Sequence, residues 1–237
     1  MKMQSLLFFV ILYGAKMNAA TWEAPFIIYE PETRKVLAHG TEVLEENGQD
    51  LVKKTTYYIG DLVGQEEYVR FKRETYTLVD YEFKDQMFGE YAKVVVKGQL
   101  AKISYKGIHD KNMRNKDLAW TPQMVSGKYI PEMIVSAWDK LMGGEYLYFD
   151  LYVPYRMDTV GFRVRKENSS DGVITFLMEA SSFFIRPFAP KLRFTFESTA
   201  MRRLLRYQGP SIVAIDGKKD LEVVVEFDYP VTGQNSP

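Results

Sequence analysis

The sequence predicts a mainly-β protein: a curved antiparallel sheet, as a half-barrel or open barrel, with one amphipathic helix packed on its apolar face. Three observations favour this fold. Apolar and polar residues alternate in segment after segment from Phe26 onward, which is typical of strands that bury one face. Turn-forming pairs such as Asp216-Gly217 separate these segments. Only one segment, residues 131–142, has the spacing of an amphipathic helix.

Residues 1–20 have the layout of a secretory signal peptide. Lys2 precedes the apolar run of residues 6–13, and the small-residue stretch 18–20 follows. We therefore expect a periplasmic or secreted protein, with a membrane-tethered amino terminus as the alternative. No later segment approaches the roughly 20 uninterrupted apolar residues that a spanning helix requires, so no transmembrane segment is expected after signal removal.

The amino half of the mature chain contains six predicted strands, near residues 26–30, 35–45, 51–59, 67–80, 91–96 and 99–105. Tyrosines recur through them and predict a tyrosine-rich surface or groove. Residues 107–128 combine many charged and amide side chains with few apolar ones. We therefore expect a long exposed loop there.

The predicted helix covers residues 131–142. Pro131 suits a first helical turn, and a glycine pair at residues 143–144 is a typical stop. The apolar stripe of the helix consists of Ile134, Ala137, Trp138 and Leu141. A solitary helix before one-sided strands packs most economically on the apolar face of their sheet, so we expect Trp138 to be its main anchor.

The carboxyl half is predicted to be a meander of strands with one apolar face. The clearest strand covers residues 145–153, and the same alternation recurs near residues 160–165, 174–178, 192–197 and 221–228. We expect this apolar face to bind a ligand. The candidate ligand-binding residues are Trp138, Phe149, Phe162, Phe176 and Phe194. The alternative is that the same side chains form a close-packed core.

Arg163 and Arg165 share one face of a predicted strand. Adjacent guanidinium groups can bind a carboxylate or a phosphate, so these two residues are candidate anion contacts. The alternative is that they pair with Glu or Asp on neighbouring strands.

Residues 181–190 interrupt the meander. Their apolar side chains Phe183, Phe184, Ile185 and Phe188 are interspersed with Arg186 and two prolines. Proline excludes a continuous central strand, so this segment is expected to be an edge, a rim or a flap over the apolar face. It could close a lipid-sized pocket or plug the end of the core.

Composition narrows the function classes. The chain has 31 Lys and Arg against 31 Asp and Glu, and removal of Lys2 and Lys16 with the signal would leave 29 against 31, a net charge of −2. This balance predicts no nucleic-acid partner. The chain has no cysteine, which excludes disulfides and thiolate chemistry. Residues 21–237 are expected to form a single domain.

Motifs of known catalysis are scarce. The sequence contains no nucleophile elbow, phosphate-binding loop, dinucleotide fingerprint or His-Glu-x-x-His motif. Its two histidines, His39 and His109, are far apart, so neither a metal nor another cofactor is expected. The absence of these motifs does not exclude a hydrolase that uses paired carboxylates. Its candidate residue is Asp150, which interrupts a tyrosine face in the middle of a strand.

Four segments carry a resemblance: residues 29–33 (YEPET), 137–145 (AWDKLMGGE), 153–164 (VPYRMDTVGFRV) and 202–209 (RRLLRYQG). Together they resemble a family of uncharacterised exported proteins of Gram-negative bacteria. The chain departs from that pattern at residues 210–213, where PSIV replaces Ser-Asn-Ile. The resemblance implies a compartment and no activity. In architecture alone, the predicted fold is similar to the half-barrel of periplasmic lipoprotein carriers.

The leading hypothesis from the sequence is a non-enzymatic periplasmic protein that binds a lipid, an acyl chain or a lipoprotein segment on the apolar face of the sheet. The first alternative is a structural or interaction module of the envelope that contacts a protein partner. The second alternative is a carboxylate-dependent hydrolase of envelope polymers.

Overall fold

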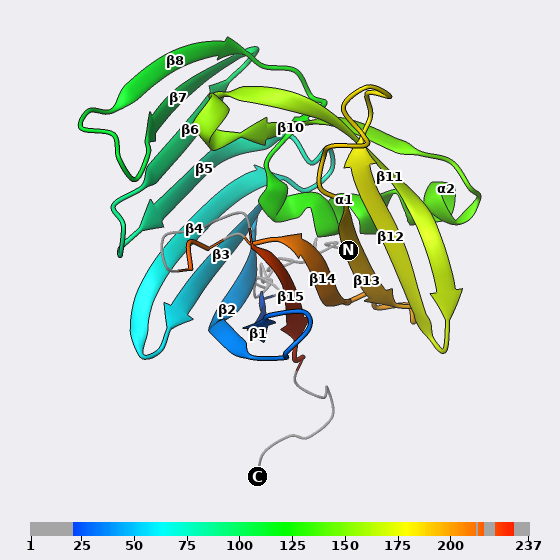
Figure 1. Cartoon of the computed structure of the whole chain (residues 1–237). Helices are drawn as coiled ribbons and strands as arrows, with labels where there is room; N and C mark the ends of the chain where they lie inside the picture. Colours follow the sequence, from blue (N-terminus) through cyan, green and yellow to red (C-terminus); the bar gives the residue numbers. More distant parts are fainter. Residues whose placement is uncertain (1–20, 212, 216–220, 230–237) are drawn as a thin grey trace, which may run out of the picture.

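The computed structural model describes residues 21–211, 213–215 and 221–229. The predicted signal peptide, residues 1–20, lies outside these ranges. The described part of the chain confirms the predicted fold class. A single sheet of 15 strands curves around a short helical segment and does not close into a barrel (Figure 1).

The first arm of the sheet is a meander of eight strands. Tight hairpin turns join several of them, because a glycine such as Gly48 or Gly60 supplies the positive φ that a two-residue turn needs. The strands are β1 (Thr21–Tyr29), β2 (Val36–Asn47), β3 (Asp50–Ile59), β4 (Leu62–Lys72), β5 (Leu78–Asp85), β6 (Tyr91–Lys97), β7 (Leu100–Lys106) and β8 (Arg114–Ala119).

The second arm begins after the helical segment and returns to the first. Its strands are β9 (Met124–Val125), β10 (Leu147–Val153), β11 (Asp158–Ser170), β12 (Val173–Ala180), β13 (Leu192–Glu197), β14 (Leu204–Pro210) and β15 (Glu222–Phe227). A 3-10 turn, η2 (Pro154–Arg156), separates β10 from β11. Strand β15 pairs with β1, so the first and last described strands join the two arms.

The sheet is open because its two outer strands do not pair. The order runs from β8 through β1 and β15 to β9, and every pair is antiparallel except β9 with β10. Side chains of β8 reach across the opening: Lys116 lies 3.3 Å from Asp158 at the start of β11, and Arg114 donates a hydrogen bond to the backbone carbonyl of Tyr155 at 3.4 Å. The molecule is therefore an unclosed, strongly curved sheet with a concave interior.

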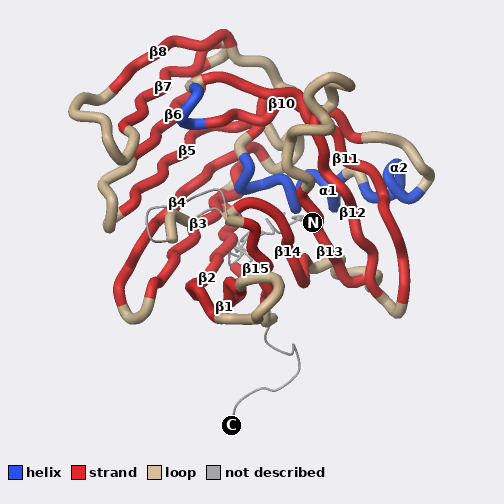
Figure 2. Tube along the Cα trace, viewed as in Figure 1, coloured by secondary structure: helices blue, strands red, loops and turns tan. Residues whose placement is uncertain are grey.

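The helical segment lies in that interior (Figure 2) and bridges the two arms. It consists of η1 (Gly127–Tyr129), α1 (Ile130–Ser136) and α2 (Trp138–Met142). Tyr129 stacks on Phe71 of β4 with ring centroids 4.6 Å apart, and Trp138 packs against Phe176 of β12 at 5.1 Å. None of the helices among the described residues is long and apolar enough to cross a lipid bilayer.

The predicted continuous helix over residues 131–142 is divided at Ala137, whose backbone leaves the helical region (φ −95°, ψ 12°). The preceding Ser136 donates its hydroxyl hydrogen bond to the carbonyl of Met133 at 2.8 Å, a local contact that bends helices. The break turns α2 away from α1, so that Trp138 can reach β12.

Two sequence predictions are corrected. Residues 107–128 are not one long loop, because they include β8, β9 and part of η1. Strand β8 is nearly all exposed and half of its residues are charged, as suits an edge strand, and it therefore lacks the apolar alternation of an inner strand. Residues 67–80 are not one strand, because a turn at residues 73–77 separates β4 from β5. That turn contains no glycine or proline, and Tyr76 supplies its positive φ.

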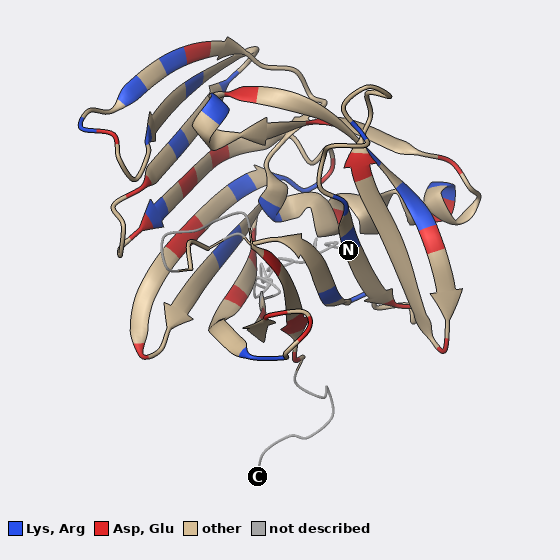
Figure 3. Cartoon of the chain, viewed as in Figure 1, with Lys and Arg blue, Asp and Glu red and all other residues tan. Residues whose placement is uncertain are grey.

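Acidic and basic residues are interspersed along the strands (Figure 3). Several form ion pairs between neighbouring strands, for example Lys54 with Glu45 at 3.1 Å. Such exposed pairs contribute at most about 1 kcal/mol each, but they keep the outer face free of a strong charge of one sign.

Candidate ligand-binding cavity

A cavity of about 430 Å³ lies within the concave interior, between the sheet and the helical segment. This volume falls in the range of about 300–1,000 Å³ that is typical of small-molecule sites. Most of its wall is apolar. The apolar lining includes Phe26, Phe83, Ile130, Leu151, Phe162, Leu192, Phe194, Leu204, Val225 and Phe227. Both arms and the start of the helical segment therefore contribute to one site.

The five candidate ligand-binding residues fall into two groups. Phe162 and Phe194 line the cavity. Phe149, Phe176 and Trp138 are buried but do not line it. The helical segment explains the division: α2 covers one part of the apolar face, where Trp138 packs edge-to-face on Phe176, and leaves the other part open.

The polar residues singled out from the sequence lie away from the cavity. Arg163 pairs with Glu179, which is directly opposite on β12, with 2.6 Å between Nη2 and Oε1. Arg165 donates a hydrogen bond to the backbone carbonyl of Lys166 at 3.2 Å. Asp150 faces Gly161 across the β10–β11 pair and is also outside the lining.

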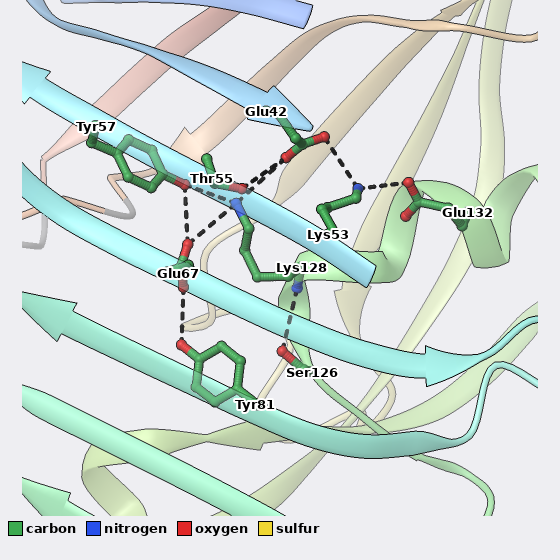
Figure 4. A network of polar contacts seen from close by, with 9 residues as sticks. All are labelled: Glu42, Lys53, Thr55, Tyr57, Glu67, Tyr81, Ser126, Lys128 and Glu132. Atoms are coloured by element: carbon green, nitrogen blue, oxygen red, sulfur yellow. Dashed lines mark hydrogen bonds and ion pairs between the residues drawn. The ribbon is translucent and has the colours of Figure 1, made fainter. Parts of the chain in front are cut away.

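One side of the cavity is polar, and we call it the polar wall: Glu42, Tyr57, Glu67, Tyr81 and Lys128 (Figure 4). The Lys128 ammonium lies 3.2 Å from Glu67 and 3.5 Å from Glu42. It also donates a hydrogen bond to the Tyr57 hydroxyl at 2.9 Å. Tyr57 and Tyr81 in turn donate to the two oxygens of Glu67, at 3.1 and 2.9 Å.

A second lysine connects the polar wall to α1. The ammonium of Lys53 lies 3.2 Å from Glu42 and 2.6 Å from Glu132 (Figure 4). The Thr55 hydroxyl donates to the other oxygen of Glu42 at 3.3 Å. Acidic and basic groups thus alternate in an unbroken chain from α1, through strands β3 and β2, to η1 and β4.

This network was missed in the sequence because strand lysines and glutamates usually face solvent. A signal was nevertheless present in the positions of these residues. Lys53 and Thr55 occupy the same alternate positions of β3 as Leu51 and Tyr57, and all four are buried. A lysine on the apolar face of a strand predicts a buried ionic partner.

The pKa directions fit the alternation of charges. Burial tends to raise the pKa of Glu42, but Lys53 and Lys128 outweigh burial and lower it. Burial tends to lower the pKa of Lys128, but Glu67 and Glu42 outweigh it and raise that pKa. Burial and the nearby Glu67 carboxylate keep the pKa of Tyr57 well above its ordinary value. Tyr57 therefore stays protonated and acts as a donor.

Glu132 behaves differently, because burial raises its pKa more than Lys53 lowers it. One of its oxygens, Oε2, has no hydrogen-bond partner among the described residues. The end of the network inside α1 therefore holds a carboxyl group that binds a proton more tightly in the folded protein than in the unfolded chain.

Glu132→Gln should change how stability depends on pH. A raised folded pKa means that the wild type loses stability as pH rises from the ordinary Glu pKa through the raised one, with a slope of up to about 1.4 kcal/mol per pH unit. The variant lacks this loss, so its stability relative to the wild type should increase over that window. Urea unfolding between pH 4 and pH 8 measures both curves, and parallel curves would contradict the assignment.

Comparison with known proteins does not assign a function to this cavity. No known protein family and no curated protein matches the sequence. The resemblance to exported proteins of Gram-negative bacteria therefore stays a prediction. Among the described residues, no group of three or more His, Asp or Glu side chains is placed to hold a metal ion.

Proposed function

We propose that this protein is exported to the periplasm and binds a lipid, an acyl chain or a lipoprotein segment in its interior cavity. The observation that carries the proposal is the cavity itself, whose walls are mainly aliphatic and aromatic and whose volume is about 430 Å³. Each methylene group that enters such a site contributes about 0.8 kcal/mol. Affinity should therefore increase with alkyl chain length until the cavity is full.

Val225→Phe should block this binding. Val225 lies on β15 in the cavity wall, so a larger side chain occupies space that the ligand needs. We expect affinity for a ten-carbon amphiphile to fall at least about tenfold, while the free energy of unfolding changes by less than about 3 kcal/mol. Displacement of the neutral fluorescent probe N-phenyl-1-naphthylamine measures the affinity.

The matched control is Val36→Phe. Val36 is an exposed residue of β2 and does not line the cavity. The Val36→Phe substitution makes the same chemical change on the outer surface, so the affinity for the amphiphile should stay at the wild-type value. Equal affinities for all three proteins would contradict binding in the cavity.

One surface feature favours a second function, contact with a protein partner of the envelope. Residues 181–190 join β12 to β13, and their four apolar side chains point into solvent, with Phe188 89% exposed. They do not plug the core. Arg186 holds the segment by donating to the carbonyls of Ala180 and Ser181, at 3.0 and 2.8 Å. Exposed apolar clusters of this kind are typical of contact sites.

A photo-crosslinking residue at Phe184 distinguishes the two functions. If a protein partner binds here, we expect one discrete protein adduct in cells, because the side chain is fully available. The same photo-crosslinking residue in place of Leu62, an exposed apolar position on β4, should give no discrete adduct. Equal labelling from both positions would contradict a specific contact.

A further inference from the structure

Residues 181–190, which we call the aromatic turn, lie beyond the ends of β12 and β13 (Figure 1). All four of their large apolar side chains are at least half exposed, and the three phenylalanines are 76–89% exposed. The rings of Phe183 and Phe184 lie edge-to-face with centroids 5.8 Å apart. A contiguous apolar cluster that is left in water usually marks a contact surface.

The backbone of the aromatic turn is suited to an apolar environment. The N–H groups of Arg186, Phe188 and Ala189 donate to carbonyls within the turn, each at 3.0 Å. Pro187 and Pro190 have no N–H group that would need a partner. The Arg186 guanidinium also donates to two backbone carbonyls at the start of the turn. These bonds reduce the cost of removing the turn from water.

The charged residues of the aromatic turn and its flanks are basic. Residues 180–191 contain Arg186 and Lys191 and no Asp or Glu. The preceding residue, Glu179, is buried and paired with Arg163 at 2.6 Å. The turn therefore brings no carboxylate of its own to a surface of phosphate groups, and the exposed Lys191 adds a favourable charge.

The aromatic turn ends at the cavity. Pro190 lines the cavity and is exposed, as are Tyr155 of η2 and Gly127 of η1, whereas the other lining residues are buried or half-buried. The turn and η2 lie at the same end of the second arm, because Ser181 donates its backbone N–H to Gly161 near the start of β11, at 3.0 Å. A surface that contacts the turn therefore meets part of the cavity rim.

A lipid bilayer fits this surface better than a protein does. A standard protein interface has about 20–30 residues on each side, more than the ten residues of the aromatic turn. A few large apolar side chains beside basic residues are instead typical of segments that insert at the boundary between head groups and acyl chains. We propose that the aromatic turn inserts into the surface of a phospholipid bilayer and holds the cavity rim against it. The inference rests on the proposed function and names the membrane as the source of the ligand.

A fluorescent label can report the insertion, because the chain has no cysteine of its own. Phe184→Cys and Leu62→Cys each carry one environment-sensitive nitrobenzoxadiazole label, and Leu62 is an exposed residue of the first arm. Vesicles of phosphatidylethanolamine and phosphatidylglycerol should shift the emission at position 184 to shorter wavelengths and increase it at least about twofold, since the label leaves water. The label at position 62 should not respond. Equal responses, or none at either position, would overturn the proposal.

Phe184→Asp measures what the turn contributes to membrane binding. Its partition coefficient into the same vesicles should fall at least about tenfold, because a phenylalanine side chain no longer leaves water. Leu62→Asp is the matched control, since it makes the same change of charge at an exposed apolar position of the first arm. It should partition like the wild type. An equal loss in both variants would contradict insertion of the aromatic turn.

The proposed function is measured separately, without vesicles. Phe184 does not line the cavity, so Phe184→Asp should bind N-phenyl-1-naphthylamine with wild-type affinity. A wild type that binds vesicles but not this probe would overturn the cavity function and leave the membrane contact standing. A wild type that binds the probe but no vesicles would overturn the membrane contact alone. One discrete protein adduct from position 184 in cells, without any response to vesicles, would assign the turn to a protein partner instead.

Discussion

Lys53→Met should destabilise the protein by about 3–5 kcal/mol, one of the largest losses expected from any single substitution in this chain. The Lys53 side chain is 1% exposed, and its ammonium lies between the carboxylates of Glu132, at 2.6 Å, and Glu42, at 3.2 Å. Methionine preserves most of the buried stem but removes the charge. Two carboxylates would then face each other in the interior with no cation between them.

The adjacent residue supplies the control. Lys54 is on the same strand and pairs with Glu45 at 3.1 Å, but its side chain is 52% exposed. Lys54→Met should therefore cost no more than about 1 kcal/mol. Urea unfolding at pH 7 measures both variants. If Lys53→Met and Lys54→Met cost the same, the buried ionic network does not contribute as the geometry requires.

A second test removes one of the carboxylates together with the lysine. Lys53→Met combined with Glu132→Gln should be more stable than Lys53→Met alone, because only Glu42 would then lose its contact with Lys53, and Lys128 still lies 3.5 Å from Glu42. The result depends on direct contact between Lys53 and Glu132, which couples the two substitutions. Strictly additive costs would mean that the two side chains do not interact.

Phe176→Ala should cost about 3–5 kcal/mol. Phe176 is completely buried on β12, with the rings of Trp138 and Phe196 at 5.1 and 5.8 Å. Its loss leaves a cavity under α2 and removes the contact that holds this helix on the second arm. The measurement is the free energy of unfolding, and near-ultraviolet circular dichroism should also report a loosened Trp138.

Two phenylalanines on the same arm serve as controls. Phe194→Ala should destabilise the protein less than Phe176→Ala, because Phe194 already borders open volume on one side. Phe194→Ala should also weaken amphiphile binding, whereas Phe176→Ala should not weaken it as long as the variant stays folded. Phe188→Ala should stay within about 0.5 kcal/mol of the wild type, since that side chain is exposed. Equal costs at Phe176 and Phe194 would contradict the division between packed core and cavity wall.

Local spacing was enough to predict the fold class and much of the second arm. Phe162 and Phe194 were placed on the buried face of their strands by alternation alone, because the pleat sends every second side chain to the same side. The apolar stripe of the helix through Trp138 could likewise be predicted from the sequence, although the division of the helix at Ala137 could not. At that division the Ser136 hydroxyl donates a hydrogen bond to the backbone carbonyl of Met133, a contact that the apolar spacing of the helix does not indicate.

The candidate site was only partly predictable. Alternation places Phe149, Phe162, Phe176 and Phe194 on one face, but it does not say which of them α2 covers. Nor does it say that Lys53 meets a glutamate 79 positions later, at Glu132. Neighbouring side chains on one strand share a face by local geometry, whereas pairs from different elements meet only after the arms have curved around the helix.

The mainly-β class, the sidedness of the strands and the position of the helix could thus be predicted from local patterns, because pleat and helical periodicity act over a few residues. The pairing of β15 with β1, the open sheet, and the cavity with a polar wall on part of its apolar face became apparent only in the folded protein. Those features arise from the curvature of the sheet and from the place where the helix rests on it, and both depend on contacts between residues far apart in the chain.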